Sequence, residues 1–390
     1  MRVAIVSFGH VDVNLPLFKH LLTSGLNVDL FLIFSLNRKS ESILDFSDKE
    51  IATGFTDSAK TGELLGSGIT NYLGDNLKVR FFIFHNQKLR SLINYHLSKT
   101  FAKSLDIYDI IHFNGINGVL PLLLMFLRKK KLVFTIHDIS SHSGEKTRFN
   151  FTEKLTTYII KSRYPLIIQN LKDFALINQK YPQISSKFKF IPFGVLDVYR
   201  EFKTAEITAP ISDLLFFGRI SPYKGIEYLI DALSILDSKG LKIKTIIAGQ
   251  GHLYFKNDNL ERLNIELINK YIKNEELVAL IENTKVIVCP YKDATQSGVV
   301  MTAFAFNKPV IASAVGSFQE VVKEEITGFL VPPGDANALA SRIEQLITDT
   351  ALINQMAKNI KVDTTSGEYS WSQIAFNTKE LYLRAISDPL

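Results

Sequence analysis

Short apolar runs alternate with amphipathic stretches along most of the chain. Runs such as 3–8, 28–34 and 79–84 are rich in β-branched and aromatic residues, which predicts buried strands. Between them, apolar residues recur three and four positions apart, as expected for helices that bury one face. The same rhythm resumes at residue 214. Strands that alternate with helices in this way predict an α/β protein with parallel sheets.

Two stretches depart from this rhythm and indicate how the chain is divided. Residues 37–76 are polar without a clear period, so no element is predicted there, and residues 194–212 are predicted to form a linker. A chain of 390 residues is also long for a single core. We therefore expect domains at 1–195 and 196–370, followed by a last segment at 371–390.

Composition narrows the class of protein. With 46% hydrophobic and 22% charged residues, the chain has enough apolar material for two packed domains. The single cysteine, Cys289, ends an apolar run, which argues against a disulfide framework and indicates a buried structural thiol in a reducing compartment. Residues 1–10 are typical of a strand rather than a signal peptide, and the longest apolar run, 118–127, is too short to span a bilayer. A cytoplasmic protein is therefore expected.

Charge is distributed unevenly between the two halves. Residues 1–195 carry 25 Lys and Arg against 15 Asp and Glu, or +10, whereas residues 196–390 carry 20 against 24, or −4. Basic residues surround a helical pattern at 89–105, and such a helix either docks on an anionic membrane or is simply a solvated face. Nucleic acid is the less favoured partner, because no motif of a nucleic-acid reader accompanies the charge. The basic residues are Lys78, Arg80, Lys88, Arg90, Lys99 and Lys103.

The most informative stretch is 286–334. An apolar run ends at Pro290, a polar loop follows, and a helical pattern begins near Gly298 and ends before Pro309, where the next strand starts. A strand, a helix and a second strand in succession predict a parallel pair. Because ligands bind beyond the carboxyl ends of parallel strands, the loop and the helix start behind it are a candidate anion site made of backbone N–H groups.

Two cations mark the beginning of the second half. A strand ends at Gly218-Arg219, and Lys224 precedes an amphipathic helix. An arginine fork and a lysine point charge suit the negative charges of a nucleotide diphosphate. Taken alone, the pair is better explained as surface charge. The glycine-containing segment IIAGQG and the loop before Gly298 shift the balance toward binding.

Taken together, these segments resemble glycosyltransferase family 4. The resemblance covers most of the chain and is strongest over 213–385. It implies the GT-B fold, in which two Rossmann-like, doubly wound parallel-sheet domains face each other across a cleft. In that fold the last helix, which carries Trp371, crosses back to pack on the first, acceptor-binding domain. The motifs are FGRISPYKG, IIAGQG, VIVCPY, KPVIAS, GSFQEVV, GFLVPPGD and SWSQIAFNTKELY, with SFGH and FTIHDIS in the first half.

The resemblance assigns roles to residues of the second half. Arg219 and Lys224 match the pair that binds the diphosphate. The backbone N–H groups of Gly298, Val299 and Val300 match the helix start that receives the phosphate and the sugar. The nucleobase is expected against the chain that follows the strand at 265–267. The residues expected around it are Lys270, Tyr271, Ile272 and Leu277.

In the first half, the resemblance assigns a third catalytic residue. His137 matches the histidine that faces the donor sugar, and Gly9, with His10 beside it, matches a glycine that lets its loop approach the reacting groups. Without the resemblance, His137 would more often be a structural hydrogen-bonding residue, and Gly9 is equally well explained as a simple turn.

One part of the family pattern is missing. The family places two glutamates eight positions apart, and here those positions hold Ala294 and Thr302. The first glutamate commonly holds a sugar hydroxyl and the second the ribose, so other side chains must take these roles or the activity is changed or lost. Thr302 is a weaker substitute at the ribose, and Glu320 is either another donor contact or a charge near a helix start. The candidates for the sugar are Asp293, Thr295, Gln296 and Ser297.

The function that the resemblance implies is retaining transfer of a sugar from a nucleotide sugar to an acceptor hydroxyl. The chain has no Asp-x-Asp motif, which suits a metal-independent mechanism without a cofactor. The expected acceptor is a lipid-linked glycan or oligosaccharide of a bacterial surface polysaccharide, such as O-antigen of lipopolysaccharide, capsule or exopolysaccharide. The expected location is peripheral, at the inner face of the cytoplasmic membrane. Two alternatives stay open: a nucleotide-sugar epimerase of the same fold, and a non-catalytic nucleotide-sugar-binding protein.

Overall fold

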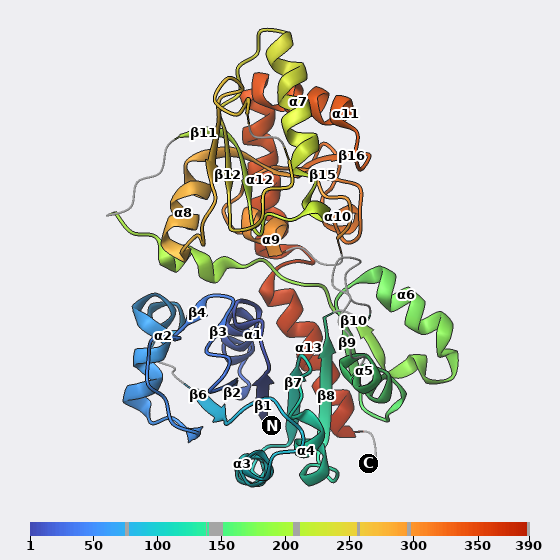
Figure 1. Cartoon of the computed structure of the whole chain (residues 1–390). Coiled ribbons are helices and arrows are strands. Elements are labelled where there is room, and N and C mark those ends of the chain that lie inside the picture. Colours follow the sequence, from blue (N-terminus) through green and yellow to red (C-terminus); the bar gives the residue numbers. More distant parts are fainter. Residues whose placement is uncertain are drawn as a thin grey trace. The chain divides into compact units, whose positions relative to one another are not determined.

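A computed structural model shows the chain as two compact units, which are described separately (Figure 1). The first unit contains the described residues of 1–194 together with the last helix, from Trp371 onward, and the second contains those of 195–370. The residues that the structure describes are 1–74, 78–137, 139, 151–205, 211–255, 258–294 and 298–387.

The first unit is built on an eight-stranded sheet. Its strands are β1 (Arg2–Ser7), β2 (Asn27–Ser35), β5 (Gly54–Phe55), β6 (Val79–Phe84), β7 (Ile110–Asn114), β8 (Lys131–Ile136), β9 (Leu166–Ile168) and β10 (Phe188–Phe190). Their order is β10-β9-β8-β7-β1-β2-β6-β5, and every pair is parallel except β5 with β6. The chain winds outward from β1 in one direction and returns beside it as β7, so the order reverses between β1 and β7.

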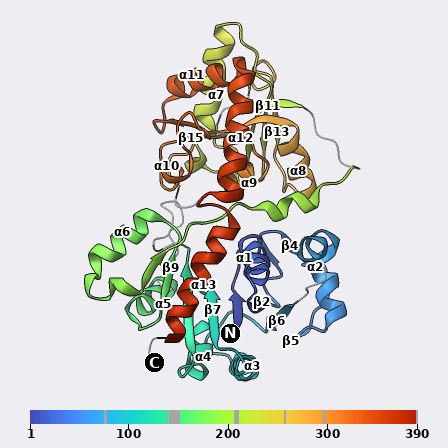
Figure 2. The same cartoon turned by 180° about the vertical axis from the view of Figure 1, so that it is seen from behind.

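Helices cover both faces of this sheet. On one face, α3 and its neighbours close an aromatic core in which the Phe101 ring meets the Phe31 and Phe82 rings at centroid distances of 5.4 and 4.7 Å. On the other face, α1 and α13 pack side by side, as Figures 1 and 2 show from opposite sides. The helices are α1 (Val11–Thr23), α2 (Ser58–Leu73), α3 (Leu92–Ser104), α4 (Leu120–Phe126), α5 (Phe151–Lys161), α6 (Leu171–Lys180) and α13 (Trp371–Ser387). A 3-10 turn, η1 (Pro182–Lys187), and a hairpin of β3 (Ser40–Glu41) and β4 (Leu44–Asp45) complete the unit.

The last helix is held by side chains that are distant in sequence. Tyr382 is fully buried, and its hydroxyl lies 2.7 Å from Nδ1 of His112 on β7. Lys379 donates to the Ser24 carbonyl at 2.9 Å, at the end of α1. Trp371 packs so closely on Gly194 that a Cβ there would lie 2.7 Å from its indole ring. The final segment is therefore an integral part of the first unit.

The second unit holds a six-stranded, fully parallel sheet. Its strands are β11 (Ser212–Phe217), β12 (Thr245–Ala248), β13 (Ile265–Ile268), β14 (Thr284–Cys289), β15 (Val310–Ser313) and β16 (Gly328–Val331). Their order is β13-β12-β11-β14-β15-β16, so the winding direction reverses between β11 and β14. The helices are η2 (Asp197–Phe202), η3 (Pro222–Lys224), α7 (Ile226–Ser238), α8 (Asn274–Glu282), α9 (Gly298–Ala305), α10 (Phe318–Val321), α11 (Ala336–Thr348) and α12 (Thr350–Ser366).

The predicted alternation of strands and helices is confirmed, with three local differences. The stretch 37–76 contains α2, whose backbone leaves helical geometry at Gly66. The apolar run 118–127 becomes helical only at Leu120, because Asn117 folds back and its Oδ1 accepts from the N–H groups of Val119 and Leu120. The predicted linker contains η2. Among the helices of the described residues, none combines the length and apolar character needed to cross a bilayer.

Candidate functional site

The second unit has a large pocket at the carboxyl ends of β11 and β12. Its empty volume is about 1150 Å³, counting the open solvent at its mouth. Ligands of doubly wound sheets bind at this edge, near the point where the strand order reverses. The residues around the pocket include Gly218, Arg219, Gly249, Tyr271, Ile272 and Leu277.

Glycines let two loops meet beneath this pocket. Gly249 has φ of +155°, and a Cβ on it would lie 1.8 Å from the carbonyl oxygen of Gly218. A Cβ on Gly251 would lie 2.0 Å from the carbonyl of Ile220, whose N–H donates to Gln250 at 3.0 Å. Any side chain would push the loops apart. The floor of the pocket is therefore bare backbone, which a ligand can approach closely.

The two predicted cations lie together, although only one reaches the pocket. Arg219 is exposed in the wall, whereas Lys224 is 9% exposed and holds its ammonium 3.7 Å from the centre of the Tyr291 ring. The pKa of Lys224 is lowered to about 8, chiefly because the residue is buried; Cys289 raises this pKa and the Arg219 charge lowers it. Below that pH Lys224 is protonated in a poorly solvated place. The mutual repulsion of Arg219 and Lys224 favours binding of an anion.

The start of α9 lies beside the same pocket. A Cβ on Gly218 would lie 3.8 Å from Val299 Cγ2, in the first turn of α9. Gly298 is exposed, Val299 is half-buried and Val300 is buried. At the other end of this helix, the guanidinium of Arg200 donates to the Ala305 carbonyl at 2.6 Å through Nε. The positive end of the helix dipole therefore points to the region of Gly218.

The loop that joins β14 to α9 is packed against two other loops. A Cβ on Gly225 would lie 2.0 Å from the Pro290 carbonyl, and one on Gly316 would lie 1.7 Å from the Ala294 carbonyl. Ala294 is 7% exposed, so the position of the family's first glutamate is buried. Asp293 is half-buried and does not line the pocket. Three further predicted sugar contacts, Thr295, Gln296 and Ser297, lie outside the described residues.

Thr302 and Glu320 are placed less favourably for the roles predicted from sequence. The Thr302 hydroxyl donates to the Gly298 carbonyl at 2.7 Å within α9, and the residue is 3% exposed. Its proton is used by its own helix, which leaves only the acceptor lone pairs of a buried hydroxyl for the predicted ribose contact. Glu320 lies on the short α10, does not line the pocket, and its backbone carbonyl accepts from the Tyr369 hydroxyl at 3.0 Å.

The predicted nucleobase region divides into two parts. Tyr271, Ile272 and Leu277 all line the pocket, and together they form an apolar wall. Lys270 does not line it, because its ammonium forms an ion pair with Glu276 at 3.0 Å. The wall offers an aromatic ring and two aliphatic side chains, which are surfaces suited to a planar base.

In the first unit, Gly9, His10 and His137 come together at the carboxyl edge of the sheet. Gly9 follows β1 with φ of +143°, and His10 follows it in the left-handed region with φ of +53°. The His10 ring stacks on the ring of His137, with centroids 3.8 Å apart and planes at 20°. His137 is 6% exposed, and its Nε2 donates to Oδ1 of Asn114 at 2.5 Å.

Burial makes His137 a neutral ring. It lowers the pKa of His137 well below its ordinary value, and the charge of a protonated His10 acts in the same direction. The hydrogen bond to Asn114 requires the proton on Nε2. A neutral imidazole of fixed orientation can hydrogen-bond a sugar hydroxyl, but at neutral pH it does not serve as a charged electrostatic partner. Among the described residues, no group of three or more His, Cys, Asp or Glu side chains is arranged to hold a metal ion.

A comparison with protein families bears on this pocket directly. Residues 202–363, which include both cations and α9, match the family described as glycosyl transferases group 1. The chain carries a glycosyltransferase group 1 domain. The pocket of about 1150 Å³, with Arg219 and the α9 start beside it, lies within this group 1 domain.

Relatives of the group 1 domain are found in archaea and bacteria. An uncharacterized glycosyltransferase of Methanocaldococcus jannaschii is 31% identical over 177 residues, or 43% of this chain and 44% of that protein. The capsular polysaccharide biosynthesis glycosyltransferase CapM of Staphylococcus aureus is 33% identical over 151 residues, or 37% of this chain and 39% of CapM. The matched regions thus span less than half the length of these relatives.

A solved structure extends the likeness to both units. The crystal structure of Anabaena HepE in complex with UDP has 18% identity and a TM-score of 0.66, and the match covers 98% of this chain and 100% of that chain. This likeness shows the GT-B fold with two Rossmann-like units, as predicted, and the group 1 domain lies in the second of them.

Sequence reasoning missed the residues that fix the His10 turn. The amide of Asn14 donates to the carbonyls of Gly9 and His10 at 3.0 and 2.9 Å and to Ser7 Oγ at 3.1 Å. Asn114 in turn orients His137. A polar amide inside an apolar helix face, as at Asn14, or at the end of an apolar strand, as at Asn114, is the signal that could have shown both.

Proposed function

We propose that this chain is a retaining glycosyltransferase that moves a sugar from a nucleotide-sugar donor to an acceptor hydroxyl without a metal ion. One observation carries the proposal. The pocket of the group 1 domain joins an apolar wall, an exposed arginine and the adjacent start of α9 at the strand-order reversal. The apolar wall is complementary to a base, the arginine to a diphosphate and the start of α9 to a sugar. The UDP bound by HepE supports a nucleotide donor.

In the proposed complex, Tyr271, Ile272 and Leu277 hold the base, and Arg219 reaches the diphosphate. The N–H groups of Gly298 and Val299 point along the α9 axis toward the same charge. Thr302 is not included, because its hydroxyl is engaged within α9. Asp293 stays a candidate for the sugar hydroxyls.

The reaction breaks the bond between the sugar C1 and the diphosphate oxygen and forms a bond from C1 to the acceptor oxygen. Negative charge develops on the leaving diphosphate, where Arg219, Lys224 and the α9 start stabilise it more than in the ground state. The acceptor hydroxyl attacks from the leaving-group side, which retains configuration. Its proton passes to a phosphate oxygen, since the proposal assigns no carboxylate to that task. Neutral His137 would hydrogen-bond the donor sugar, with Gly9 leaving room for it.

Thermal unfolding with UDP and UDP-glucose tests the donor site. A ligand that binds only the folded protein at 100 times its Kd stabilises it by about 2.7 kcal/mol. Arg219→Ala and Lys224→Met should each lose most of the shift, and methionine keeps the buried stem of Lys224. Lys358→Ala removes an exposed cation from the same unit and should keep the shift. No shift of the wild type with either nucleotide would count against the proposed donor site.

Product analysis separates transfer from the alternatives. With UDP-glucose and a bacterial lipid-linked glycan extract, the wild type should release UDP, and the same activity should survive EDTA. Conversion of the sugar in the absence of any acceptor would indicate an epimerase instead. Binding without turnover in the presence of acceptor would indicate a non-catalytic protein.

We further propose that the acceptor is a lipid-linked glycan of a bacterial surface polysaccharide, reached from the inner face of the cytoplasmic membrane. The similarity to CapM supports the pathway class. The surface around α3 supports the location: Leu92 and Ile93 are 81% and 50% exposed, beside the exposed Lys88, Arg90 and Lys99. Exposed apolar side chains with exposed cations near them in sequence suit the interface of an anionic bilayer.

Vesicle sedimentation tests this location. The wild type should pellet with vesicles containing phosphatidylglycerol and not with pure phosphatidylcholine. Leu92→Asp should remain in the supernatant. Ile107→Asp is the matched control, because Ile107 is 56% exposed in the same unit but lies between Asp106 and Asp109. Equal sedimentation of Leu92→Asp and the wild type would rule out docking through α3.

A further inference from the structure

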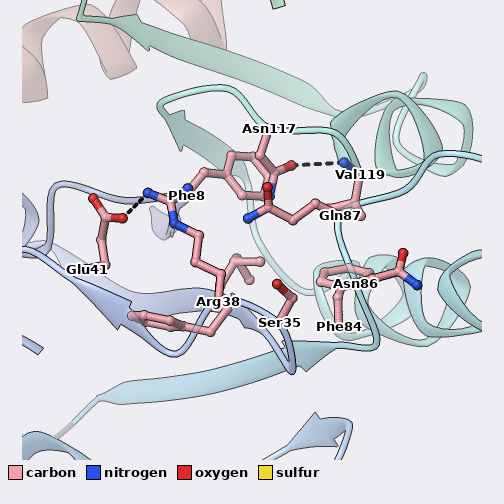
Figure 3. Close-up of a pocket in the computed structure, with 11 residues that line it drawn as sticks. Phe8, Ser35, Arg38, Glu41, Phe84, Asn86, Gln87, Asn117 and Val119 are labelled. Atoms are coloured by element: carbon pink, nitrogen blue, oxygen red, sulfur yellow. Dashed lines mark hydrogen bonds and ion pairs between the residues drawn. The ribbon is translucent and has the colours of Figure 1, made fainter. Parts of the chain in front are cut away.

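Lys224, one of the two cations assigned to the diphosphate, is buried without an acidic partner. Only 9% of the residue is exposed, and among the described residues no carboxylate forms an ion pair with it. Other cations of the chain are held by carboxylates. In the first unit, Arg38 forms an ion pair with Glu41, drawn as a dashed line in Figure 3. In the second, Lys292 forms one with Glu227. A buried ammonium without such a partner needs another group to stabilise its charge.

Two tyrosine rings stand where the carboxylate would be. The Lys224 ammonium lies 3.7 Å from the centre of the Tyr291 ring and 5.0 Å from the centre of the Tyr223 ring. Both distances are within the ~6 Å over which the negative face of an aromatic ring attracts a cation. The planes of the two rings make an angle of 83°, so the rings face the ammonium from two directions. This attraction is strongest for a cation withdrawn from water, as Lys224 is.

The rings are fixed by the packing around them. Tyr291 is 2% exposed, and its ring packs on that of Phe318 with the centroids 5.1 Å apart. The backbone beside it is tied to the turn that carries the lysine, because the N–H of Lys292 donates to the Tyr223 carbonyl at 2.8 Å. The position of the Tyr291 ring relative to Lys224 is therefore set by the fold before any ligand binds.

Rings differ from a carboxylate in the charge that they leave for a ligand. A carboxylate beside Lys224 would cancel much of its charge and repel a phosphate, whereas the rings are neutral. Burial raises the pKa of Tyr291 well above its ordinary value and that of the neighbouring Cys289 to about 12, so neither is ionised at neutral pH. The other charged group near the ammonium is Arg219, which repels it. The positive charge of Lys224 is therefore left for an incoming anion.

We propose that Tyr291 and Tyr223 are positioning residues that form an aromatic cage, which holds the Lys224 ammonium in its charged form and leaves that charge to the diphosphate. The inference rests on the proposed function, in which Lys224 stabilises the leaving group. It adds two aromatic residues to the donor site, although neither of them lines the pocket. The cage acts on the donor through the lysine alone, so its removal changes how UDP binding responds to pH.

Carbon-13 NMR of protein labelled at the lysine Cε atoms measures the charge of Lys224 without any ligand. The signal of Lys224 is the one that is absent from Lys224→Met. In the wild type its pKa should be about 8. In Tyr291→Leu, which removes the nearer ring, the pKa should be about one pH unit lower, because the charged form loses the cation–π attraction. Tyr291→Phe keeps a ring beside the ammonium and should titrate like the wild type.

Two further variants complete the experiment. Tyr228→Leu removes a ring of the same unit that lies 5.2 Å from the Lys292 ammonium, and it should leave the titration of Lys224 unchanged. Tyr223→Leu removes the more distant cage ring at a half-buried position, so it tests the cage even if Tyr291→Leu does not fold. It should lower the pKa of Lys224 by less than Tyr291→Leu does. A pKa at or above the wild-type value in these two variants would overturn the proposal, since the rings would then only exclude water from Lys224.

Calorimetry with UDP on the same proteins keeps the cage apart from the donor site. If UDP binds the protonated lysine, a pKa lowered by about one pH unit makes the UDP affinity of Tyr291→Leu about fivefold weaker than that of the wild type at pH 8 and nearly equal at pH 6. An equal loss at both pH values would contradict the cage. UDP binding by the wild type with unshifted lysine titrations refutes the cage alone, whereas the expected titrations without any UDP binding refute the donor site alone.

Discussion

The His112 network predicts that the first unit loses stability on mild acidification. His112 is fully buried on β7, and its ring nitrogens lie 2.7 Å from the Tyr382 hydroxyl and 2.8 Å from the Thr135 hydroxyl. Burial lowers its pKa to about 3. In the unfolded chain a histidine has a pKa of ~6.5, so between these values the unfolded state binds the additional proton. Stability contributed by the neutral ring is therefore complete above pH 6.5 and falls as the pH drops toward 3.

The size of the effect follows from those two pKa values. Integration of the linkage relation from pH 7 to pH 5 gives a loss of about 2 kcal/mol for His112. His137 adds a loss in the same direction, because its pKa is also lowered by burial. Asp12 acts in the opposite direction, since burial raises the pKa of its carboxyl and protonation then favours the folded state. Keeping the measurements above pH 5 limits how much ordinary carboxylates contribute to the measured loss of stability.

The single tryptophan makes this loss measurable. Trp371 is 3% exposed in α13, within the first unit, so its fluorescence follows the unfolding of that unit in urea. We expect His112→Gln to be less stable than the wild type at pH 7 but to lose about 2 kcal/mol less between pH 7 and 5. His85→Gln, at an exposed position, should keep the wild-type pH dependence. Equal pH dependence of His112→Gln and the wild type would refute the argument.

Three further predictions concern the second unit. Gly249→Ala should destabilise the unit by more than about 3 kcal/mol and abolish UDP binding, because the added Cβ would clash with Gly218. The control is Gly240→Ala, at φ of +82° with open space around it, which should cost only ~1–2 kcal/mol. Thermal unfolding followed by circular dichroism measures both losses. UDP affinity, measured by calorimetry at pH 7, 8 and 9, should fall as the pH rises through about 8, where Lys224 loses its proton, and Lys224→Met should lack this dependence. Cys289, whose pKa burial raises to about 12, should react with a disulfide reagent only after urea unfolding, and rapid reaction of the native protein would show that the thiol is accessible.

The sequence predicted those parts of the molecule whose signals are local. Apolar runs predicted the positions of the strands. Proline and glycine residues predicted the turns around α9 and the loop that carries Arg219. The helix α2 was missed, because Gly62 and Gly66 lower helix propensity and its backbone bends at Gly66. Likewise, Asn114 and Glu41 matter through contacts with residues distant in sequence, His137 and His10, which no local period reveals.

Local sequence patterns also do not reveal which groups take over the roles of the two missing glutamates. The substitution Thr302→Glu tests whether the site still accepts a carboxylate at the second of these positions. In the structure, Thr302 is 3% exposed, and its hydroxyl donates back to the Gly298 carbonyl. A carboxylate in that place would be buried, at a cost of several kcal/mol unless a hydrogen-bonding or charged partner stabilises it or its charge is neutralised.

We therefore expect Thr302→Glu to lower the unfolding temperature and leave UDP affinity unimproved. Thr302→Val, which has nearly the same shape but lacks the hydroxyl, should lose only about 1 kcal/mol. The opposite result, a stable Thr302→Glu protein that binds UDP more tightly than the wild type, would mean that the ribose site is still shaped for a carboxylate. At position 302 the chain would then differ from the family pattern only by the loss of the glutamate side chain, and the ribose site itself would not be rebuilt. Ala294, whose carbonyl packs on Gly316, would be the position where the donor site differs from that of the family.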